Sequence, residues 1–320
     1  MPAFNELEYL SLNPDVASAV RTGAFKSGYD HYQEYGKAEG RAVSRTDRTS
    51  LTARQKAIFH LIDREGQGLE IGPSLNPIAP KKNGYKVHTL DHASAEELRA
   101  KYQGEDYDLD NIEDVDFIWQ GQPLTELIGK THHYDWIIAS HVVEHIPDLI
   151  TFLQQCEQLL KPNCVLSLAV PDKRYCFDYF QPLSTTGMLL DAYTEKRTRP
   201  SSGQIFDHFA NASNLNGKIV WSANEGVADT LCHAFSEAKA IWQSATTTSK
   251  YTDAHCWHFT PESFGLIISD LNQLGLVRLE VKAQFPTSGH EFFVTLGSSE
   301  NVVNEVSSAR IDILHKMQLP

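Results

Sequence analysis

Short apolar runs alternate with helix-length segments through the middle of this 320-residue chain. Continuous apolar runs of strand length indicate strands that are buried on both faces, as in parallel sheets. Helices are predicted between these runs, one capped by Ser94 and another over 148–160. A further helix, capped by Ser50 or Thr52, is predicted ahead of the first strand, through about Arg64. The predicted strands are 68–72, 86–91, 115–119, 136–140 and 165–170. Their repeated strand–helix–strand order predicts an α/β, doubly wound sheet.

The alternation stops at Asp172 and returns only near residue 261. A helix is then predicted over 261–274, followed by two strands, 276–285 and 291–296, that pair antiparallel. The prediction is therefore a Rossmann-like, seven-stranded domain over 51–300, with an antiparallel last strand and an insert over 172–258. A helix around 310–317 is expected in the tail, 301–320.

Residues 1–45 form a separate helical module in this interpretation, joined by a polar linker over 43–50. Asn13 is predicted to cap a helix that has Pro14 at its first position. A second helix is expected to carry Tyr29, Tyr32 and Tyr35. The segments Asn-Pro-Asp-Val and Tyr-Gly-Lys-Ala-Glu-Gly-Arg resemble a short module of bacterial surface and glycan-related proteins, which would make protein contacts possible. A plain helical extension is the alternative.

Composition narrows the possible partners and location. The chain has 28 basic and 41 acidic residues, a net charge of −13, which argues against nucleic acid and anionic membrane partners. No apolar run approaches the roughly 20 residues of a membrane span, and no signal peptide is visible. Five scattered cysteines fit reduced thiols. We therefore expect a cytoplasmic protein.

Polar and small residues lie where the predicted strands end. Glu70, Gly72 and Ser74 follow the first strand, where glycine lets the backbone approach a ligand. Asp91 ends the second strand, 21 positions after Glu70, where a carboxylate can accept the hydroxyls of a ribose. The carboxyl edge of the sheet is therefore the predicted binding edge.

These residues, with the Asp135–Ile146 segment and the Leu-Lys-Pro turn at 160–162, resemble class I S-adenosylmethionine-dependent methyltransferases of the kind found with bacterial glycan genes. The resemblance implies a methyl transfer from S-adenosylmethionine, with an acidic residue on the ribose and His92 beside the adenine. The cofactor-binding positions that it implies are Glu70, Gly72, Pro73, Ser74, Asp91, His92, Gln120, Gly121, Ser140, His141 and His145.

The chain departs from that family pattern at three turns. Pro73 follows Gly72 where further glycines are usual, which removes a backbone donor. Gln120 stands where an acid is expected, and its carbonyl can still accept from an adenine amino group. Asn163 replaces a glycine and tolerates the left-handed conformation.

The segment His141-Val142-Val143-Glu144-His145 also matches the H-x-x-E-H signature of zinc peptidases. Two histidines four apart on a helix would share one face. The segment directly follows a predicted strand, however, and no third ligand is evident downstream. We therefore predict no metal site.

The insert carries the candidates for chemistry. Methylation of an oxygen needs a base for the hydroxyl proton, and Asp or His can supply it. The candidates are Asp172, His208 and His255. The predicted reaction is O-methylation of a sugar, glycan precursor or small molecule. The alternatives are a non-catalytic binding or assembly module and an NAD(P)-dependent oxidoreductase, since Asp91 would suit that ribose equally well.

Overall fold

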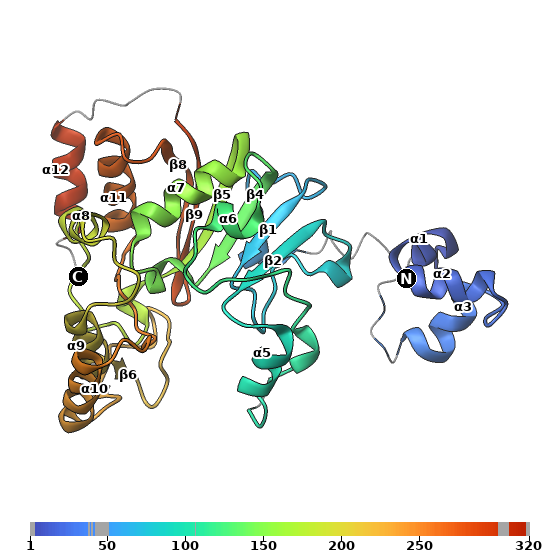
Figure 1. The fold of residues 1–320 in the computed structure, drawn as a ribbon, viewed down its shortest axis with the longest axis horizontal. Coiled ribbons are helices and arrows are strands. Elements are labelled where there is room, and N and C mark those ends of the chain that lie inside the picture. The colour runs from blue at the N-terminus through green and yellow to red at the C-terminus, as the bar shows by residue number, and fades with distance from the viewer. Residues whose placement is uncertain are drawn as a thin grey trace.

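A seven-stranded sheet with the strand order β3-β2-β1-β4-β5-β9-β8 forms the centre of the main domain (Figure 1). The computed structural model describes residues 4–37, 39, 41, 51–105, 107–299 and 307–317. The first five strands are parallel, and β9 is antiparallel to both of its neighbours. The strands are β1 (Gly68–Ile71), β2 (Val87–Asp91), β3 (Phe117–Ile118), β4 (Tyr134–Ser140), β5 (Leu160–Pro171), β8 (Leu279–Ser288) and β9 (Glu291–Ser298). The predicted fold class is confirmed.

Helices connect these strands, and their starts follow the capping residues of the sequence. Ser94 and Thr260 form capping boxes, and the Asp148 side chain accepts from the Thr151 amide. The α-helices are α4 (Ala53–Ile58), α5 (Ala95–Lys101), α6 (Leu124–Ile128), α7 (Leu149–Leu159), α11 (Pro261–Gln273) and α12 (Ser307–Lys316). Short 3₁₀ turns are η3 (Lys81–Asn83), η4 (Leu109–Asn111), η5 (Val143–His145) and η6 (Lys173–Tyr175).

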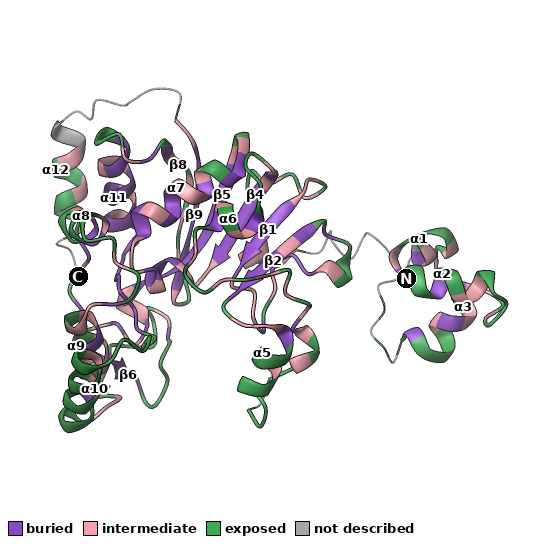
Figure 2. Cartoon of the chain, viewed as in Figure 1, coloured by how far each residue is buried: buried purple, intermediate pink, exposed green. Residues whose placement is uncertain are grey.

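The insert folds into helices and one short hairpin. It contains α8 (Thr186–Thr194), α9 (Ser202–Asn211), β6 (Ser213–Asn214), β7 (Thr230–Leu231) and α10 (Phe235–Thr247). Figure 2 shows that the central strands are largely buried, whereas α9 is mostly of intermediate exposure and α10 is largely exposed. The insert is therefore a layer added at one end of the sheet, with little core of its own.

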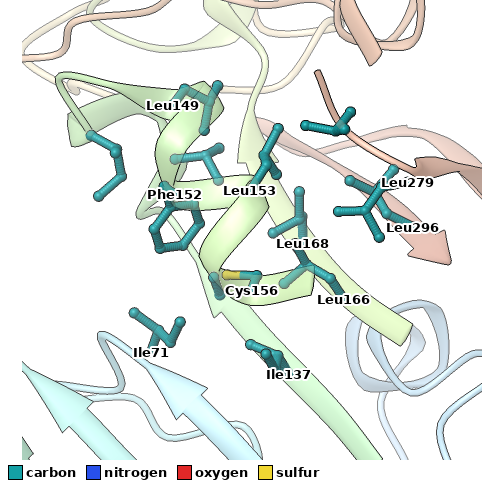
Figure 3. Packing of buried hydrophobic residues seen from close by; sticks show 14 of the residues in the cluster. Ile71, Ile137, Leu149, Phe152, Leu153, Cys156, Leu166, Leu168, Leu279 and Leu296 are labelled. Atoms are coloured by element: carbon teal, nitrogen blue, oxygen red, sulfur yellow. The ribbon is translucent and has the colours of Figure 1, made fainter. Parts of the chain in front are cut away.

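Apolar residues at helical spacing on α7 cover the strands (Figure 3). Leu149, Phe152, Leu153 and Cys156 repeat at intervals of three and four, so they share one face. Their partners on the strands include Ile137, Leu166 and Leu168, all fully buried. Each such aliphatic side chain contributes roughly 1.5–3 kcal/mol on burial, so this face fixes α7 and the β4–α7 turn in place.

Three predicted boundaries differ from the structure. Strand β3 has only two residues, because the Asp116 carboxylate accepts the Thr89 amide at 2.7 Å and replaces the ladder there. The helix predicted to reach Arg64 ends at Ile58, and Leu61 follows with φ 65°. The predicted turn before β5 is a bulge inside that strand, with Asn163 at φ 62° as its residue type allows.

The N-terminal residues form α1 (Glu6–Leu12), α2 (Pro14–Arg21), α3 (Gly28–His31) and the π-helical turn η1 (Tyr32–Gly36). Pro14 opens its helix as predicted, but the prediction that the Asn13 side chain caps it is wrong. Its Nδ2 donates instead to the Tyr9 carbonyl at 2.8 Å, which satisfies the preceding turn. The predicted linker over 43–50 lies outside the described residues. None of the described helices combines the length and apolar character needed to cross a membrane.

Candidate functional site

The loop after β1 rests directly on the segment after β4. Ile71 pairs with Ala139, so the two strands end side by side. Gly72 follows with φ 69°, and a β-carbon placed there would lie 2.7 Å from Cγ2 of Val142. Only glycine fits this position without strain or displacement. The geometry therefore explains the glycine by its close approach to Val142, and its approach to a ligand stays a prediction.

Asp91 is buried at the end of β2 and already holds the neighbouring loops. Its Oδ2 accepts from the Ser74 amide at 3.0 Å, and its Oδ1 accepts from the His92 amide at 2.7 Å. The His92 ring Nδ1 lies 2.7 Å from the same Oδ1, although that ring is mostly exposed. A carboxylate has about four acceptor positions, so a ribose hydroxyl can bind at Oδ2 and a second one by displacing the His92 ring.

Glu70 lies beneath the β1 loop rather than in the binding edge. Its carboxylate accepts the amides of Ile78 at 2.6 Å and Ala79 at 3.0 Å. Burial raises its pKa to about 7, against the opposing effect of those two hydrogen bonds. The structure therefore gives Glu70 the role of shaping the loop over 73–79, in which Pro73 and Ser74 (φ 40°) make the turn.

Gln120 and Gly121 follow β3, where the resemblance implies contact with the adenine. Gln120 is exposed, and its amide donates to Oε1 of Gln122 at 2.7 Å. Gly121 has φ 92° and open space around it. The two residues are accessible to a ligand, but among the described residues none makes a hydrogen bond to the Gln120 side chain.

Ser140 and His141 belong to a buried ionic network that the sequence analysis missed. Arg54 donates from Nη2 to the Ser140 hydroxyl at 2.7 Å and binds both oxygens of Glu291, at 2.6 and 3.0 Å. His141 Nε2 lies 3.0 Å from the same carboxylate. Burial opposes ionisation of Glu291, yet these partners lower its pKa to about 2. No local pattern marks Arg54 or Glu291, because they lie 237 positions apart.

His145 faces the insert. Its Nδ1 lies 2.9 Å from Oδ1 of Asp253, and its ring centroid is 4.5 Å from that of His255. Burial opposes protonation, but the hydrogen bond to Asp253 and the charge of Glu144 raise the pKa of His145. The segment after β4 thus reaches residues more than 100 positions later in the chain.

Two of the three predicted base candidates lie together at this point. The His255 amide donates to Nδ1 of His208 at 3.2 Å, and the His255 ring Nδ1 lies 2.6 Å from Oδ2 of Asp178. Burial, together with the neighbouring His255, lowers the pKa of His208 to about 4. His208 is therefore neutral at pH 7.

The third candidate, Asp172, is fully buried and already bonded. Its carboxylate accepts from the Arg174 amide and from Nε and Nη2 of the Arg174 guanidinium at 2.7–3.0 Å, and from the Thr287 hydroxyl at 2.6 Å. A carboxylate engaged in this way anchors the turn after β5. The arrangement does not favour Asp172 as a general base.

A pocket of about 160 Å³ opens between the ends of β4 and β5 and the insert. Its polar walls come from both sides, and one aromatic ring, Phe177, contributes an apolar face. It is lined by His141, Glu144, His145, Pro171, Cys176, Phe177, Val220, His255 and His290. Since Val142 lies between two of these residues and touches Gly72, the pocket adjoins the predicted cofactor edge.

A larger cavity of about 480 Å³ lies within the insert, between the start of α9 and the end of α10. Four of its lining residues are basic: Lys196, Arg197, Arg199 and Lys250. One acidic residue, Glu195, also lines the cavity and pairs with Arg197 at 2.7 Å. The lining still carries a net positive charge, in contrast to the net charge of −13 of the chain, and this favours an anionic group. The two cavities are joined by a short stretch of chain: Thr252 lines the larger cavity, and His255, three positions later, lines the smaller pocket.

Similar solved structures are distant in sequence and shape. One is described as a Zn-dependent alcohol dehydrogenase from Rhodobacter sphaeroides, with 12% identity over 77% of this chain and 90% of that chain (TM-score 0.42). The CcbJ methyltransferase from Streptomyces caelestis has 14% identity over 77% and 89% (TM-score 0.39). An S-adenosylmethionine-dependent methyltransferase from Mesorhizobium loti has 12% identity over 77% and 97% (TM-score 0.39).

No curated protein sequence matches the chain. A family model described as a methyltransferase domain matches residues 44–272. The match covers the sheet edge, the β4–α7 segment and most of the insert. Because it spans more than half of the chain, the protein belongs to the methyltransferase domain family.

Proposed function

We propose that this protein transfers a methyl group from S-adenosylmethionine to a hydroxyl of a sugar, a glycan precursor or another small molecule. The observation that carries the proposal is the contact between Gly72 and Val142, which joins the loop after β1 to the wall of the small pocket. A cofactor lying along the sheet edge from Asp91 to Gly72 would direct its reactive end toward that pocket.

The residues at the edge fit S-adenosylmethionine. Asp91 is buried with acceptor capacity to spare for a ribose, and the loop after β1 packs closely on Val142 at Gly72. The cofactor supplies an electrophilic methyl group on a sulfonium. The chain's own contribution is to hold the acceptor oxygen in line with that methyl group.

The acceptor side is formed by the insert. Phe177 offers a ring face to a sugar or aryl group, and His255 lines the pocket with His208 accepting its amide. Asp172 is bonded to Arg174. The basic cavity beside Thr252 supports an acceptor that carries a phosphate or carboxylate. A phosphorylated sugar would offer a ring to Phe177 in the small pocket and a phosphate to the basic cavity.

Binding measurements test this proposal first. By calorimetry, we expect S-adenosylhomocysteine to bind with a micromolar or lower Kd and NADH not to bind. Absence of S-adenosylhomocysteine binding at high micromolar concentration would support a non-catalytic module instead. Tighter binding of NADH would support an oxidoreductase. Methyl transfer to matched phosphorylated and unphosphorylated sugars then identifies the acceptor class.

The N-terminal helices and the location of the protein are separate parts of the proposal. Leu7 and Tyr29 are exposed on these helices, which supports a protein contact rather than a catalytic role. A Leu7→Ser, Tyr29→Ser variant should therefore retain full methyl transfer. All five cysteines are free thiols, which supports a cytoplasmic location.

A further inference from the structure

Glu144 is a buried carboxylate that lacks hydrogen-bond partners. Its side chain is fully buried, and neither carboxylate oxygen has a hydrogen-bond partner among the described residues. Nδ1 of His141 lies 3.6 Å from Oε1, which is within ion-pair range when that imidazole is protonated but exceeds hydrogen-bond distance. An unpaired buried carboxylate costs several kcal/mol unless a charge or a metal compensates it. The position therefore points to a missing cation.

Two histidines lie beside this carboxylate. One ligand atom from each of Glu144, His145 and His255 lies within 4.8 Å of the other two. The two imidazole rings are 4.5 Å apart and nearly perpendicular, at 86°. Metal–ligand bonds of about 2.0–2.2 Å would require the three atoms to move closer by roughly 1 Å.

Both histidines have a carboxylate at Nδ1, as metal-binding histidines usually do. Nδ1 of His145 faces Asp253 at 2.9 Å, and Nδ1 of His255 faces Asp178 at 2.6 Å. A carboxylate on Nδ1 fixes that proton, so Nε2 keeps a lone pair for a ligand. A carboxylate partner behind each coordinating histidine is the usual support of a metal site.

The fold brings His255 to the segment after β4 through main-chain contacts. The Cys256 amide donates to the Glu144 carbonyl at 2.7 Å, and Nε1 of Trp257 donates to the Ile146 carbonyl at 2.6 Å. Trp257 is buried, so the end of the insert is held against η5. His255 is therefore available as a third ligand. Its position in the sequence, far from the His141–His145 segment, does not reveal that it lies there.

We propose that Glu144, His145 and His255 bind one divalent transition-metal ion of the zinc, iron or cobalt class. Two imidazoles and a carboxylate suit these ions, whereas Mg²⁺ and Ca²⁺ prefer oxygen ligands. Three protein ligands leave coordination positions open, as in catalytic sites. Those positions face the small pocket, which these three residues line.

The metal site would give the proposed methyl transfer a way to activate the acceptor, and this role of the metal rests on the proposed function. A hydroxyl of the acceptor bound at an open position would have a lowered pKa and release its proton to water. A lone pair of that oxygen then forms the bond to the methyl carbon. The carbon–sulfur bond breaks with its electrons passing to sulfur, which leaves S-adenosylhomocysteine. His255 acts as a ligand in this scheme rather than as the base.

Metal titration of tag-free, chelator-treated full-length protein tests the site. We expect one Co²⁺ per chain with visible d–d absorption, displaced by one equivalent of Zn²⁺. The isosteric Glu144→Gln change and His255→Asn should each abolish that spectrum, and Asp178→Asn should weaken binding roughly 10–100-fold. His60→Asn, on an exposed histidine outside the pocket, should bind as the unmodified protein does.

The outcomes separate this inference from the proposed function. Unchanged Co²⁺ stoichiometry and spectrum in folded Glu144→Gln and His255→Asn proteins would overturn the metal site. So would the absence of binding by the unmodified protein. S-adenosylhomocysteine calorimetry on the same metal-free protein reports the cofactor edge independently. If the metal-free protein binds S-adenosylhomocysteine, the methyltransferase proposal is supported whether or not the protein binds a metal.

Discussion

The contact between Gly72 and Val142 joins the two halves of the site, because a β-carbon at Gly72 would lie 2.7 Å from Cγ2 of Val142. Gly72→Ala should therefore combine a strained positive φ, which costs about 1–2 kcal/mol, with displacement of Val142. We expect at least tenfold weaker binding of S-adenosylhomocysteine by calorimetry.

Gly129→Ala is the matched control for that change. Gly129 has φ 68°, nearly the same as the 69° of Gly72, but has open space where its β-carbon would lie. It should lose similar stability without loss of binding. Adding Val142→Ala to Gly72→Ala should restore part of the affinity, and no recovery would show that the contact is not the cause.

Asp91 is expected to supply most of the affinity for the ribose. Replacement by Asn removes the charge and leaves one acceptor oxygen, which the Ser74 and His92 amides already claim. Hydrogen bonds to charged groups contribute about 1.5–3 kcal/mol, so Asp91→Asn should weaken S-adenosylhomocysteine binding about 10–100-fold. His92→Ala, which frees Oδ1, should bind at least as well as the unmodified protein. A weaker His92→Ala would assign that ring a direct contact instead.

The sequence was sufficient for the sheet, because buried strands and capped helices leave local patterns. Apolar runs located β1, β2, β4 and β5, and the spacing of Glu70 and Asp91 located the carboxyl edge. The acceptor side was harder to predict, since its residues meet only through long-range packing. His255 reaches Glu144 and His145 because Trp257 is buried against Ile146, and no spacing along the chain encodes that contact.

Glu70 should give the protein an unusual dependence of stability on pH. Burial raises its pKa to about 7 from its usual 4.5, so the folded state binds this proton more tightly than the unfolded state. The free energy of unfolding should therefore fall as pH rises from 4.5 to 7, by up to about 3 kcal/mol from this group. Glu70→Gln removes the titration. Urea unfolding should give plots of unfolding free energy against pH that converge toward pH 4.5, where both side chains are neutral, and separate as pH rises to 7. Parallel plots would exclude the effect.

Arg54 is expected to stabilise the fold through Glu291, whose side chain is only 8% exposed. Arg54→Met would leave that carboxylate with His141 as its remaining partner, and breaking a buried pair costs 3–5 kcal/mol when both groups are enclosed. Because the Arg54 side chain is 37% exposed, solvent screening reduces the expected loss to about 1–3 kcal/mol. In the pair Arg197–Glu195 the nitrogen–oxygen distance is similar, 2.7 Å, but the carboxylate is 59% exposed, so Arg197→Met should cost less stability than Arg54→Met. The double variant Arg54→Met, Glu291→Gln should recover stability, because no buried charge is then left unpaired. Equal losses for Arg54→Met and Arg197→Met in urea unfolding would mean that burial of Glu291 does not strengthen the pair.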